Sequence, residues 1–208
     1  MKQIVLLCLA VLSFSAVAGD LKLNTPGTSG GATLREALSK RCSLRNYTGA
    51  ALSAQQLSDL FYSACGINRK SDGKLTIPTA RNVQDIVLYA ATADGIYRYN
   101  AAAHTLVLLK KGDFRTRFGM QKAMFAKAAV VLIYTSDLKK YNFGSDQEKN
   151  VFAAVHAGFA MQNVGLFCAA EGLGNVIIGS YDRKSTPELL GLGKDSAVLM
   201  VQLVGVLK

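Results

Sequence analysis

The stretch Arg-Cys-Ser-Leu-Arg at residues 41–45, followed by Tyr47, places two arginines and a serine at alternate positions. In an extended backbone, alternate side chains project to the same side, about 7 Å apart. Arg41, Ser43 and Arg45 would then present two guanidinium groups and a hydroxyl together. Planar arginine donors match the oxygens of a phosphate group. The stretch therefore predicts a phosphate site, although a pair of solvated surface charges would give the same pattern.

The first eighteen residues have the pattern of a secretory signal peptide. Met1-Lys2 gives a short positive start, residues 4–17 are almost continuously apolar, and Ala16-Val17-Ala18 offers a small-x-small cleavage site. Residues 1–18 are therefore predicted to be removed as the protein is exported to the periplasm or secreted.

The remaining chain is predicted to contain a flexible tether over residues 19–31 and one domain over residues 32–208. The whole chain has a net charge of +10. However, its Lys and Arg residues are scattered and lack interleaved aromatics, which argues against nucleic-acid binding. Residues 151–170 are long enough and apolar enough to span a membrane. Because they include His156 and two side-chain amides, we expect instead a buried central helix that also packs in a dimer interface, and no membrane span after signal cleavage.

Strands and helices are expected to be interspersed without regular alternation, which favours an α+β fold. Capping boxes at Thr33 and Ser53 predict a helix after each, the first with Leu34, Ala37 and Leu38 on one face, and residues 67–84 predict an irregular loop. The other expected elements are a hairpin over 85–92 and 95–100, a strand at 105–110, a helical segment at 113–127, strands at 128–135, 175–178 and 197–207, and a helix near 186–188.

The inventory of reactive residues does not indicate a metal or hydrolytic site. The two histidines, His104 and His156, are far apart, and no cysteine pair has the spacing of metal ligands. Nucleophile-elbow, Walker A and complete dinucleotide-binding motifs are missing from the sequence. We expect His156 to be a satisfied core or interface residue rather than a catalyst, and Cys42, Cys65 and Cys168 to be buried, inert thiols.

Three segments, in order, resemble the nitroreductase family of FMN-dependent oxidoreductases. Residues 41–47 are similar to its Arg-Arg-Ser-x-Arg-x-Phe/Tyr opening, with Cys42 in place of the second basic residue. Residues 78–84 (Pro-Thr-Ala-Arg-Asn-Val-Gln) are similar to its Pro-Ser-x-x-Asn-x-Gln loop, and residues 172–180 carry the third likeness. Within the family, residues 64–69 and 95–100 resemble the azoline-oxidising, thiazole- and oxazole-forming dehydrogenases of modified-peptide biosynthesis.

The resemblance implies a nitroreductase-like α+β fold: a homodimer with a mainly antiparallel central sheet flanked by helices and FMN near the subunit interface. Residues 41–45 would hold the phosphate and ribityl chain, with Cys42 contributing backbone. The loop at residues 78–82 would reach the isoalloxazine ring from the second subunit, and the Gly179 N–H would face flavin N5. Without the resemblance, that loop fits an ordinary turn and Gly179 a strand end. The implied cofactor-binding residues are Arg41, Cys42, Ser43, Arg45, Pro78, Thr79, Ala80, Asn82, Ile178, Gly179 and Ser180.

The implied function is that of an exported FMN-dependent oxidoreductase. Hydride would pass through flavin N5 to or from an unidentified small-molecule or peptide substrate, with NAD(P)H as the candidate electron donor. This chemistry requires no side-chain acid or base and no metal, because the flavin supplies it. Two alternatives stay open: a non-catalytic flavin carrier or sensor, and an exported basic protein that has lost the cofactor and binds an anionic partner.

Overall fold

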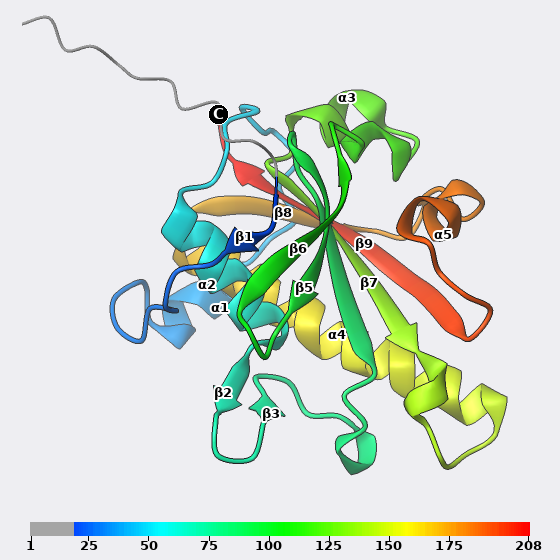
Figure 1. Ribbon diagram of the computed structural model, residues 1–208. Coiled ribbons are helices and arrows are strands. Elements are labelled where there is room, and N and C mark those ends of the chain that lie inside the picture. The colour runs from blue at the N-terminus through cyan, green and yellow to red at the C-terminus, as the bar shows by residue number, and fades with distance from the viewer. Residues whose placement is uncertain (1–18) are drawn as a thin grey trace, which may run out of the picture.

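The computed structural model describes residues 19–208, so the predicted signal peptide lies outside the described residues. Within them, a seven-stranded sheet has the strand order β1-β6-β5-β4-β7-β9-β8 (Figure 1). Every pair of neighbouring strands in this sheet is antiparallel. The predicted α+β architecture, with a mainly antiparallel sheet and flanking helices, is confirmed.

The elements follow one another along the chain as β1 (Leu21–Lys22), α1 (Leu34–Lys40), α2 (Ala54–Cys65), β2 (Ile67–Arg69), β3 (Lys74–Leu75), the 3-10 turn η1 (Ala80–Asn82), β4 (Ile86–Ala91), β5 (Gly95–Asn100), β6 (Thr105–Lys111), η2 (Arg115–Arg117), α3 (Lys122–Lys127), β7 (Val130–Asp137), η3 (Leu138–Lys140), α4 (Asp146–Ala170), β8 (Leu173–Ile178), α5 (Ser185–Leu190) and β9 (Ser196–Val206).

Local capping fixes where the longer helices begin. Thr33, Ser53 and Ser145 each accept a hydrogen bond from the backbone N–H three residues later, and the Glu or Gln at that later position bonds back to the cap. Each capping box satisfies donors that a helix start otherwise leaves unpaired. The helix starts predicted after Thr33 and Ser53 are confirmed.

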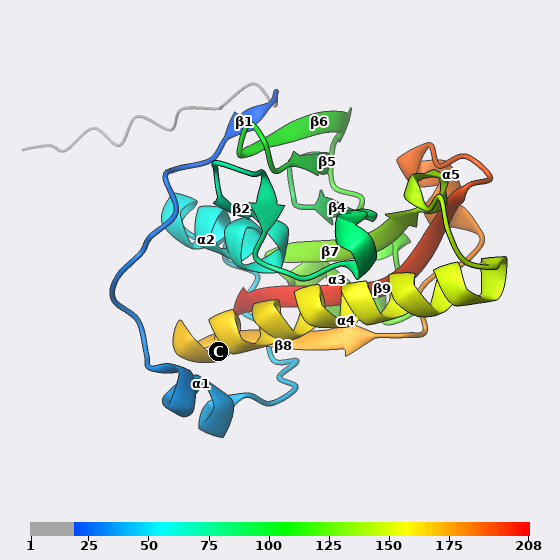
Figure 2. The same cartoon turned by 90° about the horizontal axis from the view of Figure 1, so that it is seen from below.

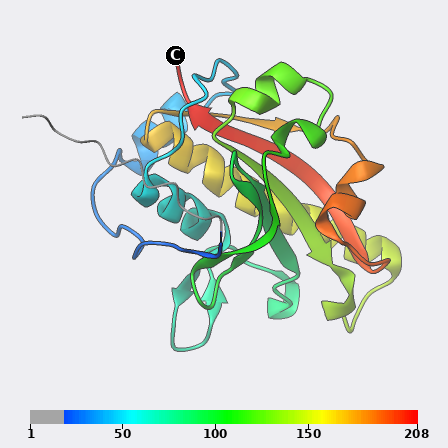
Figure 3. The same cartoon turned by 45° about the horizontal axis from the view of Figure 1, so that its top comes forward.

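The sheet separates two apolar cores, because its side chains alternate between its faces. In β7, Val130, Leu132 and Tyr134 pack into the core beneath α2 and α4. Val131 and Ile133 pack into the opposite core, which includes residues of α3 and α5. In Figure 2, α4 (yellow) runs along one side of the sheet, and in Figure 3, β9 (red) runs in nearly the same direction as this helix.

The prediction of a flexible tether over residues 19–31 is wrong for its first half. β1 pairs with β6, with Leu21 opposite Leu106, and Leu23 is buried. The Gly27 N–H donates to Asp59 on α2 at 2.7 Å. Since the edge of β6 offers unpaired backbone groups, even a Gly- and Thr-rich segment can dock there.

Two other segments differ from their predictions, the first by being more regular and the second by being less so. Residues 67–84 contain the β2–β3 hairpin and η1 rather than one irregular loop. Residues 113–127 form η2 and the short α3 rather than one continuous helical segment.

Helix α4 is the one helix, within the part of the chain the structure describes, whose length and composition would allow a membrane span. In its most apolar window, 44% of the residues are buried inside the domain. Ala157, Ala160 and Val164 face the sheet and are fully buried. We therefore interpret α4 as the central helix of the domain, as predicted.

A buried arginine predicts how stability responds to acid. Arg115 donates to both carboxylate oxygens of Asp113, at 2.9 and 2.6 Å, and to the Ala128 carbonyl. These hydrogen bonds hold the pKa of Asp113 below its usual value of 3.8. Such a carboxyl stabilises the fold above its unfolded pKa, and this contribution is lost as the pH falls through its folded pKa.

The free energy of unfolding should therefore fall as the pH drops below 3.8, and Asp113→Asn should remove part of that dependence. Only part is expected because the pKa values of Glu36 and Glu148 are lowered too, by their capping boxes. Denaturant titrations at about pH 5 and about pH 3 measure the difference. An unchanged pH dependence in Asp113→Asn would contradict this account.

Candidate functional site

The segment after α1 is anchored along β8 by its backbone and by one tyrosine. The Leu44 N–H donates to the Asn175 carbonyl at 2.8 Å, and Tyr47 pairs with Leu207. The Tyr47 side chain is 1% exposed, and its hydroxyl donates back to the Leu44 carbonyl at 2.8 Å. Burial raises the pKa of Tyr47 well above its usual 10. Tyr47 is therefore a structural anchor for residues 41–45.

The Tyr47 ring also explains why residue 174, in the third family-like segment (residues 172–180), is a glycine. A Cβ added at Gly174 would lie 2.9 Å from this ring, and one at Gly205 would lie 2.8 Å from it. Both distances are shorter than the contacts that Cβ atoms make in real structures, so a side chain at either position would force the Tyr47 ring to move. The first and third motifs are therefore in direct contact, and Gly174 is needed there for packing.

The two arginines of this segment keep their guanidinium groups unpaired. Arg41, Ser43 and Arg45 are exposed, and within residues 19–208 neither arginine forms an ion pair with a carboxylate. Arg45 makes only a long hydrogen bond, 3.4 Å, to the Ser43 carbonyl. The aliphatic part of Arg41 lies beside α4, 3.8 Å from where a Cβ at Gly165 would stand. These free donors have the chemistry of a phosphate site.

The prediction of three buried cysteines is wrong for Cys42, which is exposed with its thiol free. It lies in the loop that leaves α1, where neighbouring side chains do not cover it. Cys65 and Cys168 are buried, as predicted. Burial raises the pKa of Cys65 to about 12 and raises that of Cys168 as well, so neither is a thiolate near neutral pH.

The third segment ends β8 with an open glycine. Ile178 is the last residue of β8 and pairs with Val201. Among the described residues, no acceptor for the Gly179 N–H is found, and a Cβ at Gly179 would contact only the Met200 sulfur, at 3.8 Å. Packing within the described chain thus does not require a glycine here, and both the N–H and the space beside it are available to a ligand.

The loop at residues 78–84 is held in an unusual backbone conformation. Arg81, Asn82 and Gln84 have φ angles of 50°, 56° and 46°, which non-glycine residues rarely adopt. The Thr79 hydroxyl accepts from the Gln84 N–H at 3.0 Å, and the Ala80 N–H donates to His156 Nε2 at 2.8 Å. Asn82 remains exposed at the tip of η1.

The buried partner of this loop is a hydrogen-bonded group that the sequence analysis missed. His156 Nδ1 lies 2.6 Å from Asp85 Oδ1, and the Ser136 hydroxyl donates to Asp85 Oδ2 at 2.6 Å. All three side chains are buried. The expectation that His156 is a satisfied core residue is confirmed. A sequence signal did exist, since Asp85 directly precedes an apolar strand and a buried carboxylate needs partners.

Of the three segments that resemble the family, only residues 41–47 and 172–180 lie together within one chain; residues 78–84 lie apart from them. Residues 41–45 lie beside β8, which ends at Ile178, directly before Gly179. The loop at 78–82 contacts α4 at His156, about 14 Å along the helix from Gly165. Figure 2 shows β8 and the η1 turn (teal) on opposite sides of α4.

Large apolar side chains are exposed on α4, β8 and α1. Val151, Val155 and Phe159 recur every four residues on α4 and are 56%, 45% and 41% exposed, so they form one stripe on the helix. Ile177 of β8 is 44% exposed. Leu34 and Leu38 of α1, which packs against α4, are also exposed although they were predicted to share a face with buried Ala37. We call this set the apolar stripe; its members are Leu34, Leu38, Val151, Val155, Phe159 and Ile177.

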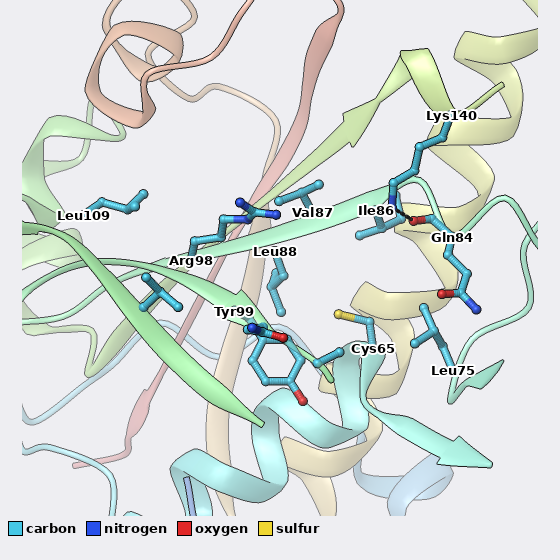
Figure 4. Close-up of a pocket in the computed structure, with 13 residues that line it drawn as sticks. Cys65, Leu75, Gln84, Ile86, Val87, Leu88, Arg98, Tyr99, Leu109 and Lys140 are labelled. Atoms are coloured by element: carbon cyan, nitrogen blue, oxygen red, sulfur yellow. Dashed lines mark hydrogen bonds between the residues drawn. The ribbon is translucent and has the colours of Figure 1, made fainter. Parts of the chain in front are cut away.

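A cleft of about 320 Å³ lies elsewhere, where β4 and β5 diverge (Figure 4). The two strands pair only from Tyr89 to Ala91. Figure 4 shows Arg98, Gln84 and Lys140 around the opening, and none of the predicted cofactor-binding residues lines it. In addition, no group of three His, Cys, Asp or Glu side chains in residues 19–208 is arranged to hold a metal ion.

Known proteins similar to this chain are described as nitroreductases. The family model described as the nitroreductase family matches residues 38–206. A protein of Methanocaldococcus jannaschii described as a nitroreductase is 24% identical over 176 residues, covering 80% of this chain and 88% of that protein. A crystal structure from Ralstonia eutropha JMP134, also described as a nitroreductase, has a TM-score of 0.85 and 29% identity, covering 92% of this chain and 90% of its own.

Two more distant structures share the fold. The Escherichia coli microcin synthetase McbBCD complex with truncated pro-MccB17 bound has a TM-score of 0.69 and 18% identity, covering 89% of this chain and 77% of the matched one. A nitroreductase structure from Desulfovibrio desulfuricans in complex with FMN has a TM-score of 0.61 and 19% identity, covering 85% and 87%. The matched family model, on a fold shared with these structures, shows that this chain belongs to the nitroreductase family.

Proposed function

We propose that this chain is an FMN-dependent oxidoreductase that passes hydride through flavin N5 to or from a small-molecule or peptide substrate. The observation that carries the proposal is a set of free donors along one strand. The Arg41 and Arg45 guanidinium groups and the Ser43 hydroxyl lie where residues 41–45 bond to Asn175. The unpaired Gly179 N–H lies about 13 Å further along. Phosphate donors at one end and a single N–H at the other suit the two ends of FMN.

The residues present fit this cofactor. Arg41, Ser43 and Arg45 would bind the phosphate and ribityl chain, with the Cys42 backbone beside them. The Gly179 N–H would orient the ring between Ile178 and Ser180. Bound FMN would supply the redox chemistry, taking up hydride at N5 and giving it up again. NAD(P)H is the donor we propose.

We also propose that the protein acts as a homodimer. The apolar stripe exposes large side chains on α1, α4 and β8, three of them in line along α4, and exposed apolar surface that extends beyond single residues marks interaction sites. A second copy packed on the stripe would bring the partner's loop at residues 78–82 towards the donors on β8. That arrangement explains why the loop and the donors stay apart within one chain.

Phe159→Glu should convert the dimer into monomers, because a carboxylate would be buried in the apolar contact. FMN binding should fall with it, since the loop at 78–82 would no longer reach the cofactor. Light scattering and flavin titration measure the two effects. Asp146→Ala, on the same helix with a side chain that is 97% exposed, is the matched control. A Phe159→Glu protein that stays dimeric would show that the interface lies elsewhere.

Turnover separates an oxidoreductase from a flavin carrier. We expect NADPH, added without oxygen, to bleach the flavin absorbance of the FMN-loaded protein. A protein that binds FMN but whose flavin is reduced by neither NADPH nor NADH would instead be a carrier or sensor.

We further propose that the protein is exported, on the basis of the sequence pattern at residues 1–18 alone. The mature chain should begin at Gly19. Mass spectrometry of the protein from the periplasmic fraction or the medium measures this. Recovery of the uncleaved chain in the cytoplasm would contradict export.

A further inference from the structure

A buried serine, aspartate and histidine from three different elements meet behind the loop at residues 78–84. We infer that Asp85 and His156 are positioning residues that hold this loop in the shape in which it meets the flavin. This inference rests on the proposed FMN-dependent function. Asp85 stands at the start of β4, Ser136 on β7 and His156 on α4, and their side chains are all buried.

The hydrogen bonds assign one tautomer to His156. The Ala80 backbone N–H can only donate, so Nε2, 2.8 Å away, accepts. The proton is therefore on Nδ1, which donates to Asp85 Oδ1 at 2.6 Å. Asp85 Oδ2 accepts from the Ser136 hydroxyl. Asp85 thus fixes the ring so that a lone pair points at Ala80, as an orienting carboxylate does for other histidines.

The loop needs such an anchor because its backbone is strained. Three of the four residues after Ala80 have positive φ, and such conformations persist only when surrounding contacts impose them. In the middle of the loop, the Arg81 guanidinium lies over the Phe143 ring, 4.4 Å from its centre, and two further contacts act at the far end. Gln84 Nε2 donates to the Gly73 carbonyl, and Lys140 Nζ donates to the Gln84 carbonyl at 2.6 Å (Figure 4). His156 is the buried contact at the near end.

The same geometry argues against a nucleophilic role for these side chains. The Ser136 hydroxyl donates to Asp85, not to His156, so the serine–histidine contact of an activated nucleophile is not formed. Both ring nitrogens of His156 are occupied, and the group is sealed from solvent. What it can do is fix Ala80 and, through it, Thr79 and Asn82, the residues proposed to meet the flavin.

Two substitutions each remove one of the two hydrogen bonds that His156 makes, the bond to Ala80 or the bond to Asp85. In His156→Gln, the amide oxygen can replace Nε2 as acceptor for Ala80, whereas the bond to Asp85 is lost. In His156→Asn, the amide N–H can replace Nδ1 towards Asp85, whereas the acceptor for Ala80 is lost. Amide hydrogen exchange by NMR on the flavin-free full chain should be about tenfold faster at Ala80 in His156→Asn, and only slightly faster than wild type in His156→Gln, which keeps the acceptor but loses the orienting bond to Asp85. FMN affinity should follow the same order, with His156→Asn about tenfold weaker.

A third variant acts on the loop side of the contact. Ala80→Pro removes the N–H donor, and the extended conformation of Thr79 tolerates a following proline. Because the proline Cδ would stand where the N–H now faces His156 Nε2, the variant should push the loop away from His156, speed exchange at Asn82 and Val83, and weaken FMN binding. Equal exchange in His156→Gln and His156→Asn, or unchanged FMN affinity in Ala80→Pro, would overturn the inference. If the wild-type protein bound no FMN, the proposed function would fail, whereas the exchange data would still test whether His156 fixes the loop.

Discussion

Replacing Arg41 and Arg45 together by alanine is expected to weaken FMN binding about a hundredfold or more. Each guanidinium would contribute charge-assisted hydrogen bonds to the phosphate, and losing two such contacts costs about 3 kcal/mol. Neither arginine forms an ion pair in the part of the chain that the structure describes. The thermal unfolding midpoint should therefore change little while the affinity falls. Titration of the flavin-free protein with FMN, followed by fluorescence quenching, measures the loss.

The matched control removes the same charge from another element. Lys122→Ala with Lys127→Ala takes two exposed cations from α3, and we expect FMN affinity to change less than about threefold because exposed charges that do not contact the ligand are screened. An equal loss in both double variants would mean that only the overall positive charge matters. Unchanged affinity in the arginine variant would place the phosphate elsewhere.

Asp85→Ala is expected to lower the free energy of unfolding by about 3 kcal/mol or more. The change leaves the buried Ser136 hydroxyl without its acceptor, and leaves the buried Nδ1–H of His156 with only the Tyr141 hydroxyl, 3.3 Å away. Each buried unsatisfied donor costs about 1–3 kcal/mol. Denaturant unfolding of wild type and variant gives the difference.

Asp146→Ala is again the control, because that carboxylate is 97% exposed and its loss should cost less than about 1 kcal/mol. If Asp85→Ala cost no more than Asp146→Ala, the buried group would not contribute to stability as we describe. FMN affinity in Asp85→Ala should also fall, since the carboxylate orients His156 towards Ala80.

Features set by residues close in the sequence were predictable. The capping boxes at Thr33 and Ser53 lie within one helical turn, so the sequence alone locates the helix starts. The β4–β5 hairpin likewise follows from adjacent alternating segments and a short turn. For the candidate site, the spacing of Arg41, Ser43 and Arg45 indicated an anion before any fold was known.

Features set by distant residues were not predictable in this way. The docking of residues 21–27 depends on the edge of β6 and on Asp59 of α2. The Asp85–His156 contact joins residues 71 positions apart, and neither residue alone signals the other. Exposure of Leu34 and Leu38 was likewise missed, because periodicity gives a helix an apolar face but does not say whether its own chain or another covers it.

The most direct test of the central claim is whether FMN leaves the purified protein when it is denatured. The account predicts a yellow protein, flavin absorbance that stays with the protein on gel filtration, and release of about one FMN per chain, identified by chromatography against an FMN standard. A colourless preparation that also fails to take up added FMN would contradict it.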